Sequence, residues 1–246
     1  MINIAVSLLL GVGVFFLFNL LLFPGHWIIA LIVGQIAAIA LFFILARLTM
    51  KKVTATIELA NEELMKGQFD RAINILEGGF KYRYRHPFVA AQLNSQIGVI
   101  YYYKKDFKKA EEYLAKGMAS HYIGQCMLGI LYMKKKDEEK MNRVFKSATR
   151  LSGKESIVWS LYAYCLSSLG KKTEAIEILN KGLKRLPNDE NIKANLAALQ
   201  NNQKMKMRAY KEMWSIFMLE KTIVRQEPPK FVRGGGGGGI RKIYRR

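Results

Sequence analysis

The chain has 246 residues, of which 50% are hydrophobic, and it carries a formal net charge of +20 at pH 7. Its length allows one or two domains. Its two cysteines, Cys126 and Cys165, lack metal-ligand spacing, which argues against a disulfide framework and against a zinc site. The hydrophobic residues are concentrated near the N-terminus and the excess positive charge near the C-terminus.

Two apolar runs begin the chain. Residues 2–23 contain no charge, and residues 28–50 contain Arg47 as their only charge. As helices, each run would be about 33 Å long, enough to cross a hydrocarbon core of about 30 Å. The first run has no basic segment before it and no small-x-small cleavage site, which favours a retained helix over a cleaved signal peptide. We therefore expect a transmembrane hairpin over residues 1–52.

Small residues are predicted to form the contact between the two helices. Folding the chain about Pro24-Gly25-His26-Trp27 brings Gly11 and Gly13 opposite Ala37 and Ala38. Gln35, the most deeply placed polar residue, is expected to bond within this pair. An oligomer contact or a transport site is the functional alternative for Gln35.

The flanking charges predict the orientation of the hairpin. Arg47, Lys51 and Lys52 follow the second helix, whereas the turn offers only His26. The positive-inside rule therefore predicts a two-pass membrane protein with both termini and all residues after 50 in the cytoplasm.

From residue 53 the sequence repeats with a period of about 34 residues. In each repeat a helical segment ends at a turn rich in lysine and glycine, and a second helical segment contains a small residue near its start. Ala72, Ala110 and Ala175 occupy that position, and Met141 replaces the small residue in the third repeat. One such helical pair cannot bury its apolar face alone, so neighbouring pairs must stack.

This pattern resembles the tetratricopeptide repeat family, whose units carry small residues where two antiparallel helices cross, followed by a proline. The resemblance implies an all-α solenoid of about four helix-turn-helix units over residues 53–203, with a degenerate last helix from residue 190. The third unit departs from the family at Met141, and the first lacks the proline. The fourth unit matches most family positions: Trp159, Tyr162, Ala163, Gly170, Ala175, Gly182 and Pro187.

Residues 204–224 have the pattern of an amphipathic helix. Met207, Tyr210, Trp214, Phe217 and Met218 would form one apolar stripe opposite a basic face. The first interpretation is a helix that caps the end of the solenoid. The second is a basic amphipathic helix that lies on a membrane or is offered to a partner.

The resemblance also implies a concave groove lined by the first helix of each unit. Its lining is aromatic, sulfur-bearing and mostly uncharged, which suits an apolar helix or extended protein segment rather than a peptide carboxylate. Val99, Cys126 and Ile130 in these helices are expected to belong to the core between repeats. The predicted protein-binding residues are Asn61, Ser95, Tyr102, Met133, Ser160, Tyr164 and Ser167.

An insertion between the first two units reads KYRYRHP, from Lys81 to Pro87. Its arginines, Arg83 and Arg85, are predicted to contact anions, and its tyrosines suit stacking on the bases of single-stranded nucleic acid. A longer loop whose side chains extend along apolar surface is the alternative.

The C-terminal segment, residues 225–246, is predicted to be a flexible basic tail. Six consecutive glycines lack the lysine and the serine or threonine of a phosphate-binding loop. Residues 201–246 contain twelve basic and three acidic residues. The predicted anion contacts are Arg241, Lys242, Arg245 and Arg246, and the expected partners are anionic lipid headgroups, then RNA, then an acidic protein.

The sequence contains no catalytic constellation and no motif for a metal or a cofactor, because His26, His86 and His121 have no partners at ligand or triad spacing. The favoured hypothesis is a non-enzymatic scaffold anchored in a membrane, which binds a protein segment in its groove and recruits it to a membrane assembly. The alternative is an RNA-binding or ribosome-binding factor at the membrane. Self-association of the chain stays open.

Overall fold

The computed structural model describes residues 2–22 and 26–220. Every regular element in these ranges is helical, which confirms the predicted all-α class. The chain divides into two compact units. The division falls between Leu93 and Asn94, inside helix α4 (Val89–Tyr103). Residues 225–246 of the predicted tail, with Arg241, Lys242, Arg245 and Arg246, lie outside the described residues, as do residues 221–224 of the predicted amphipathic segment.

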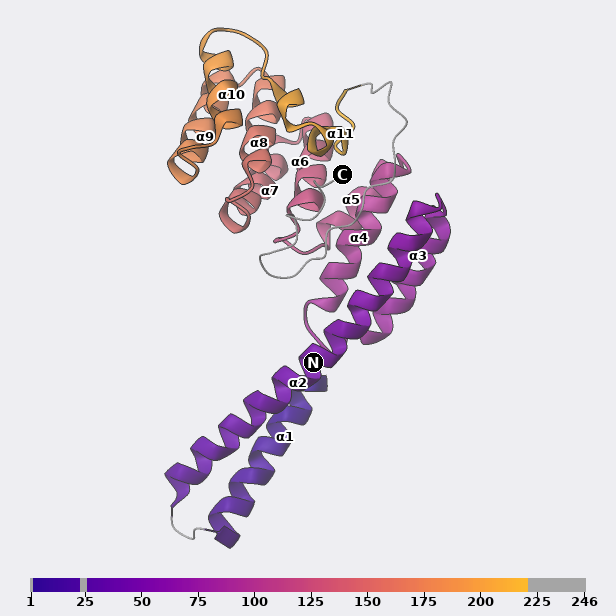
Figure 1. Ribbon diagram of the computed structural model, residues 1–246, viewed down its shortest axis with the longest axis vertical. Helices are drawn as coiled ribbons and strands as arrows, with labels where there is room; N and C mark the ends of the chain where they lie inside the picture. Colours follow the sequence, from indigo (N-terminus) through magenta and orange to yellow (C-terminus); the bar gives the residue numbers. More distant parts are fainter. Residues whose placement is uncertain (1, 23–25, 221–246) are drawn as a thin grey trace, which may run out of the picture. The chain divides into compact units, whose positions relative to one another are not determined.

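The first unit begins with a helical hairpin. Helix α1 (Ile2–Leu17) continues into a π-helical turn, η1 (Phe18–Leu22), and the much longer helix α2 spans Trp27–Met65. Figure 1 shows α1 lying along the first half of α2. Both apolar helices are long enough to cross a membrane, as the sequence predicts.

Small residues form the closest contact of the hairpin. A Cβ atom placed on Gly11 would lie 2.8 Å from the Cβ atom of Ala38, and one on Gly34 would lie 2.6 Å from the Gly11 carbonyl oxygen. The predicted approach of Gly11 to Ala38 is therefore confirmed. Gly13 does not take part, since a Cβ atom there would meet nothing within 4 Å.

The polar bond between the two helices lies at the open end of the hairpin. Asn3 Nδ2 donates a hydrogen bond to Thr49 Oγ1 at 3.1 Å, and both side chains are buried. Gln35, expected to bond inside the pair, is instead exposed and lines a shallow apolar hollow next to Gly34. This buried polar pair favours one register of the two helices, because a shift would leave the Asn3 amide without its Thr49 acceptor, whereas the Thr49 hydroxyl also donates to the Leu45 carbonyl within its own helix.

Helix α2 also supplies the first half of the first repeat. Its buried residues Val53, Ile57, Ala60 and Leu64 follow helical spacing and pack against α3 (Phe69–Gly78). The expected boundary between residues 52 and 53 thus falls inside one continuous helix. Nothing in the segment Lys51-Lys52-Val53 stops a helix, so the hairpin and the first repeat share a rigid rod about 58 Å long.

The second unit stacks helical pairs in chain order (Figure 1). Close crossings hold each pair together, since a Cβ atom on Gly98 would lie 2.7 Å from Leu114 and one on Gly129 would lie 2.4 Å from the Phe145 ring. Such a close approach leaves no room for a longer side chain at either glycine. The helices after α4 are α5 (Phe107–Ala115), α6 (Tyr122–Lys134), α7 (Glu138–Leu151), α8 (Ser156–Ser168), α9 (Lys172–Arg185) and α10 (Glu190–Gln200).

The N-terminal end of α6 is capped by a histidine. His121 Nδ1 accepts a hydrogen bond from the backbone N–H of Gly124 at 3.1 Å. Burial lowers the pKa of His121 to about 4. Because Nδ1 accepts a hydrogen bond only when it carries no proton, the cap requires the neutral ring.

We expect the stability of the chain to fall in acid through His121. The folded pKa lies below the unfolded value of 6.5, so the contribution of the neutral ring is complete above about pH 6.5 and is lost as the pH falls toward 4. At about pH 5 the loss is about 2 kcal/mol. His121→Ser keeps a capping oxygen without this titration. Urea unfolding of the natural protein and of His121→Ser at about pH 7 and pH 5 measures this loss of stability. An equal pH dependence of the two free energies of unfolding would contradict the role of His121.

The segment after α10 differs from the predicted amphipathic helix. It forms a 3₁₀ turn, η3 (Met207–Tyr210), and one short helical turn, α11 (Glu212–Ser215), separated at Lys211 with φ of 51°. Met218 also has a positive φ of 51°. The prediction of one continuous helix over this segment is therefore wrong, although its apolar side chains do pack against the solenoid.

Candidate functional site

The C-terminal described segment runs back over the first helices of the repeats, and we call residues 205–220 the return segment. Figure 1 shows the chain turning back after α10 across α8. At its start, Asn195 of α10 accepts a hydrogen bond at Oδ1 from the backbone N–H of Lys206 at 2.7 Å. Met207 is buried, with 2% of its surface exposed, and its sulfur lies 3.7 Å from Asn195 Nδ2.

The middle of the return segment contacts two predicted groove residues on α8. The hydroxyl groups of Ser160 and Tyr210 are hydrogen-bonded at 2.8 Å. The rings of Tyr164 and Trp214 meet edge to face, with centroids 5.0 Å apart. Ser160 is fully buried and Trp214 is 4% exposed, so these contacts exclude water.

The end of the return segment contacts a predicted groove residue on α4. Tyr102 donates a hydrogen bond from its hydroxyl to the backbone carbonyl of Phe217 at 2.7 Å. Tyr102 and Phe217 are both fully buried. Burial raises the pKa of Tyr102 above its ordinary value, which keeps the phenol protonated as a donor.

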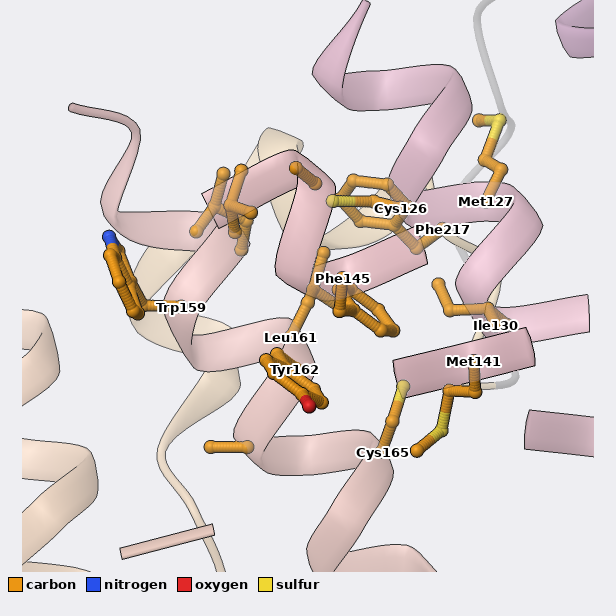
Figure 2. Close-up of a cluster of buried hydrophobic side chains, with 14 of the residues drawn as sticks. Cys126, Met127, Ile130, Met141, Phe145, Trp159, Leu161, Tyr162, Cys165 and Phe217 are labelled. Atoms are coloured by element: carbon orange, nitrogen blue, oxygen red, sulfur yellow. The ribbon is translucent and has the colours of Figure 1, made fainter. Parts of the chain in front are cut away.

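Phe217 belongs to the central apolar cluster of the second unit. The cluster includes Cys126 and Ile130 of α6 and Cys165 of α8, all fully buried (Figure 2). Val99 of α4 is also buried, so the expectation that Val99, Cys126 and Ile130 are core residues is confirmed. Phe217 therefore fills space between the inner helices rather than resting on their surface.

The geometry of the solenoid explains why the return segment is not one helix. Its contacts run from α10 past α8 to α4, which is three helix spacings, or about 24–30 Å at 8–10 Å each. The eleven residues from Met207 to Phe217 would span only about 15 Å as a continuous helix. The breaks at Lys211 and Met218 allow the chain to cover this distance and still place its apolar residues inward.

The other predicted groove residues have different surroundings. Ser95 is buried and accepts a hydrogen bond at Oγ from the backbone N–H of Met118 at 2.7 Å, beneath the turn between α5 and α6. Met133 and Ser167 are half-buried. Asn61 is half-buried on α2, in the first unit. Tyr102, Ser160 and Tyr164 thus all contact the return segment, whereas Ser95 bonds to the turn between α5 and α6.

Sequence reasoning did not predict that the chain covers its own groove. The sequence pattern that pointed to these contacts is an apolar stripe, which has to pack against another apolar surface. The stripe consists of Met207, Tyr210, Trp214, Phe217 and Met218. The uncharged groove offered such a surface within the same chain. The first interpretation of this stripe was a cap at the end of the solenoid, whereas the stripe contacts Tyr102 of α4 and Ser160 of α8.

The KYRYRHP insertion lies against the open end of the hairpin. After the 3₁₀ turn η2 (Gly79–Tyr82), the backbone carbonyl of Tyr84 accepts a hydrogen bond from the N–H of Ile2 at 2.7 Å. The His86 ring stacks on Phe42 of α2 with centroids 6.4 Å apart. Arg83 and Arg85 are exposed, and each lies over a tyrosine ring of the same loop.

Within residues 2–22 and 26–220, no three side chains are grouped as metal ligands. Cys126 and Cys165 are free thiols, and burial raises the pKa of both, which keeps them protonated. The contacts described above consist of apolar packing and neutral hydrogen bonds.

Known proteins agree with the repeat assignment. The tetratricopeptide repeat family model matches residues 91–119 and 157–189, which are the second and fourth predicted units. No curated protein matches the chain. Among solved structures, one titled "MamA RS-1 ArsTM double mutant" is 15% identical, covers 68% of this chain and 93% of its own, and has a TM-score of 0.48. The chain therefore contains tetratricopeptide repeats at these two positions, within a stack of helical pairs.

Proposed function

We propose that this protein is a protein-interaction scaffold anchored in a membrane by its N-terminal hairpin, and that its inner groove binds an apolar protein segment. The observation that carries the proposal is the occupied groove, in which Tyr102, Ser160 and Tyr164 all contact the return segment. These contacts support a groove that accepts aromatic and sulfur-bearing side chains with neutral hydrogen bonds. A partner would present the same chemistry and would have to displace the return segment.

The hairpin supports the membrane part of the proposal. Residues 1–57 contain no acidic residue, and their cations are Arg47, Lys51 and Lys52 at the open end of the hairpin. We propose that this end, and the repeats that follow it, lie on the cytoplasmic side. Since α2 is continuous from the hairpin into the first repeat, the scaffold would be held at the membrane without a flexible linker.

A peptide-binding experiment tests the groove. A chain that ends after residue 204 has the groove uncovered, and a labelled synthetic peptide of residues 205–220 should bind to it. A peptide with Trp214→Ala should bind about thirtyfold more weakly, because a buried tryptophan anchor is worth 2 kcal/mol or more. The matched control peptide carries Arg208→Ala, an exposed position, and should bind almost unchanged. Equal binding of all three peptides would contradict a groove built for this segment.

The full chain tests whether the groove is available to partners. Proximity labelling in the source cell should recover more of a membrane-associated protein with Trp214→Ala than with the natural chain, because the variant loosens the covering segment. Arg208→Ala should behave like the natural chain. An identical set of labelled proteins for the natural chain, Trp214→Ala and Arg208→Ala would contradict partner binding in the groove. Any partner would then bind another surface of the protein.

A further inference from the structure

A second surface, in the first unit, combines exposed cations and aromatic rings at the open end of the hairpin. Its loop part is Lys81–Phe88, in which Lys81, Arg83, Tyr84 and Arg85 are exposed and Phe88 is 59% exposed. Its helix part is Arg47, Lys51 and Lys52 of α2, all exposed. We call these residues together the basic collar.

The contacts of the loop place the two parts at one level of the hairpin. A Cβ atom on Gly79, just before the loop, would lie 3.4 Å from the Thr56 side chain. The His86 ring near the end of the loop stacks on Phe42. The loop therefore runs along α2 between residues 56 and 42, and the three helix cations fall in that stretch of about 21 Å.

Two hydrogen bonds indicate where the collar lies relative to the apolar span of the hairpin. The Asn3–Thr49 hydrogen bond and the bond from the Ile2 N–H to the Tyr84 carbonyl mark where α1 begins. The apolar span of the hairpin ends there, at Arg47 on α2. Exposed tyrosine and phenylalanine next to arginine and lysine are the residues that occupy the headgroup level of a bilayer.

The sequence around the collar is poor in acidic residues, and the acidic residues next to it are Glu58 of α2 and Glu77, four positions before Lys81. Neither residues 1–57 nor residues 78–105 contain an acidic side chain. The Arg83 guanidinium lies 4.5 Å from the Tyr84 ring centroid, and its Nη2 donates to the Tyr84 hydroxyl at 2.6 Å. This arrangement orders the arginine while leaving further N–H donors for an anion.

We propose that the basic collar binds the phosphate groups of anionic phospholipids in the leaflet that the hairpin enters. The proposal rests on the membrane anchor proposed above. It assigns KYRYRHP to lipid rather than to RNA, because the loop is fixed beside the apolar helices, where headgroup phosphates are the nearest polyanion. Because the contributions of the cations are sub-additive, about tenfold preference for an anionic over a zwitterionic lipid is expected.

The test uses the full chain reconstituted in phosphatidylcholine vesicles, with spin-labelled phosphatidylglycerol or spin-labelled phosphatidylcholine as the probe. Electron spin resonance measures the fraction of each probe held at the protein. The natural chain should prefer phosphatidylglycerol about tenfold, and K81Q/R83Q/R85Q should lower this to about threefold. The matched control, K146Q/K181Q/K184Q, removes three exposed lysines of the second unit and should keep the full preference.

Four outcomes would overturn the proposal. Equal association of both lipids with the natural chain is one, and an unchanged preference in K81Q/R83Q/R85Q is another. Displacement of the lipid by millimolar inorganic phosphate would indicate a site for the free ion. Binding of a single-stranded oligonucleotide that K81Q/R83Q/R85Q abolishes, with lipid association unchanged, would assign the loop to nucleic acid.

Alkaline extraction of the membranes separates this proposal from the membrane anchor. Chains that stay in the membrane but show no lipid preference would overturn the collar alone. Chains released by alkali would overturn the anchor and the collar together.

Discussion

Replacement of Phe217 by alanine is expected to lower the free energy of unfolding of the second unit by about 3–5 kcal/mol. Phe217 is fully buried, and its backbone carbonyl accepts the hydrogen bond from the Tyr102 hydroxyl. Removal of the ring leaves a cavity between the inner helices, which the neighbouring side chains only partly refill. The measurement is urea unfolding of the full chain, followed by near-ultraviolet circular dichroism.

Phe217→Leu is the matched control for this prediction. It keeps most of the apolar volume, so the expected loss is below about 1.5 kcal/mol. If Phe217→Ala and Phe217→Leu each lower the free energy of unfolding by less than about 0.5 kcal/mol, the return segment contributes no core packing. The groove would then be open in solution, and the proposed competition with a partner would have no basis.

Replacement of Gly129 by alanine is expected to destabilise the second unit by about 1–3 kcal/mol. A Cβ atom there would lie 2.4 Å from the Phe145 ring, which is fully buried and stacked on Tyr162 with centroids 5.0 Å apart. The ring has no free space to move into, so α6 and α7 must separate. The cost should appear as a lower urea midpoint with an unchanged slope.

Gly78→Ala is the matched control, since it is the same chemical change at a helical glycine. A Cβ atom on Gly78 would meet nothing within 4 Å. Alanine is a better helix former by about 1 kcal/mol, so this variant should be as stable as the natural chain or slightly more stable. Destabilisation by both substitutions to the same extent would contradict the packing argument for Gly129.

The small residues show how far sequence reasoning reached. The resemblance gives Gly182 as a family position, and a Cβ atom added there would lie 3.0 Å from the Trp159 side chain, in the other helix of its pair. This works because both helices of a pair are close in sequence. The spacing of their residues therefore determines which side chains can meet.

The hairpin shows a partial success. Apolar length predicted both helices, and the small residues predicted the contact between Gly11 and Ala38. The polar bond was assigned to Gln35, but Asn3 and Thr49 make it. Which polar residue faces the other helix depends on the rotation of each helix about its axis, and the hydrophobic pattern is uniform around both helices, so it does not define that rotation.

The sequence by itself determined the helices, the repeat period and the apolar runs, because these depend on interactions among residues near one another in the chain. It also identified the apolar stripe of residues 207–218. Only the tertiary structure decided what the stripe contacts, since Ser160 is 50 positions away from its partner Tyr210, and Tyr102 is 115 positions away from its partner Phe217. The same holds for the basic loop, whose neighbour at the hairpin is Phe42. Both surfaces arise from contacts that depend on how distant helices stack, and no local pattern encodes that arrangement.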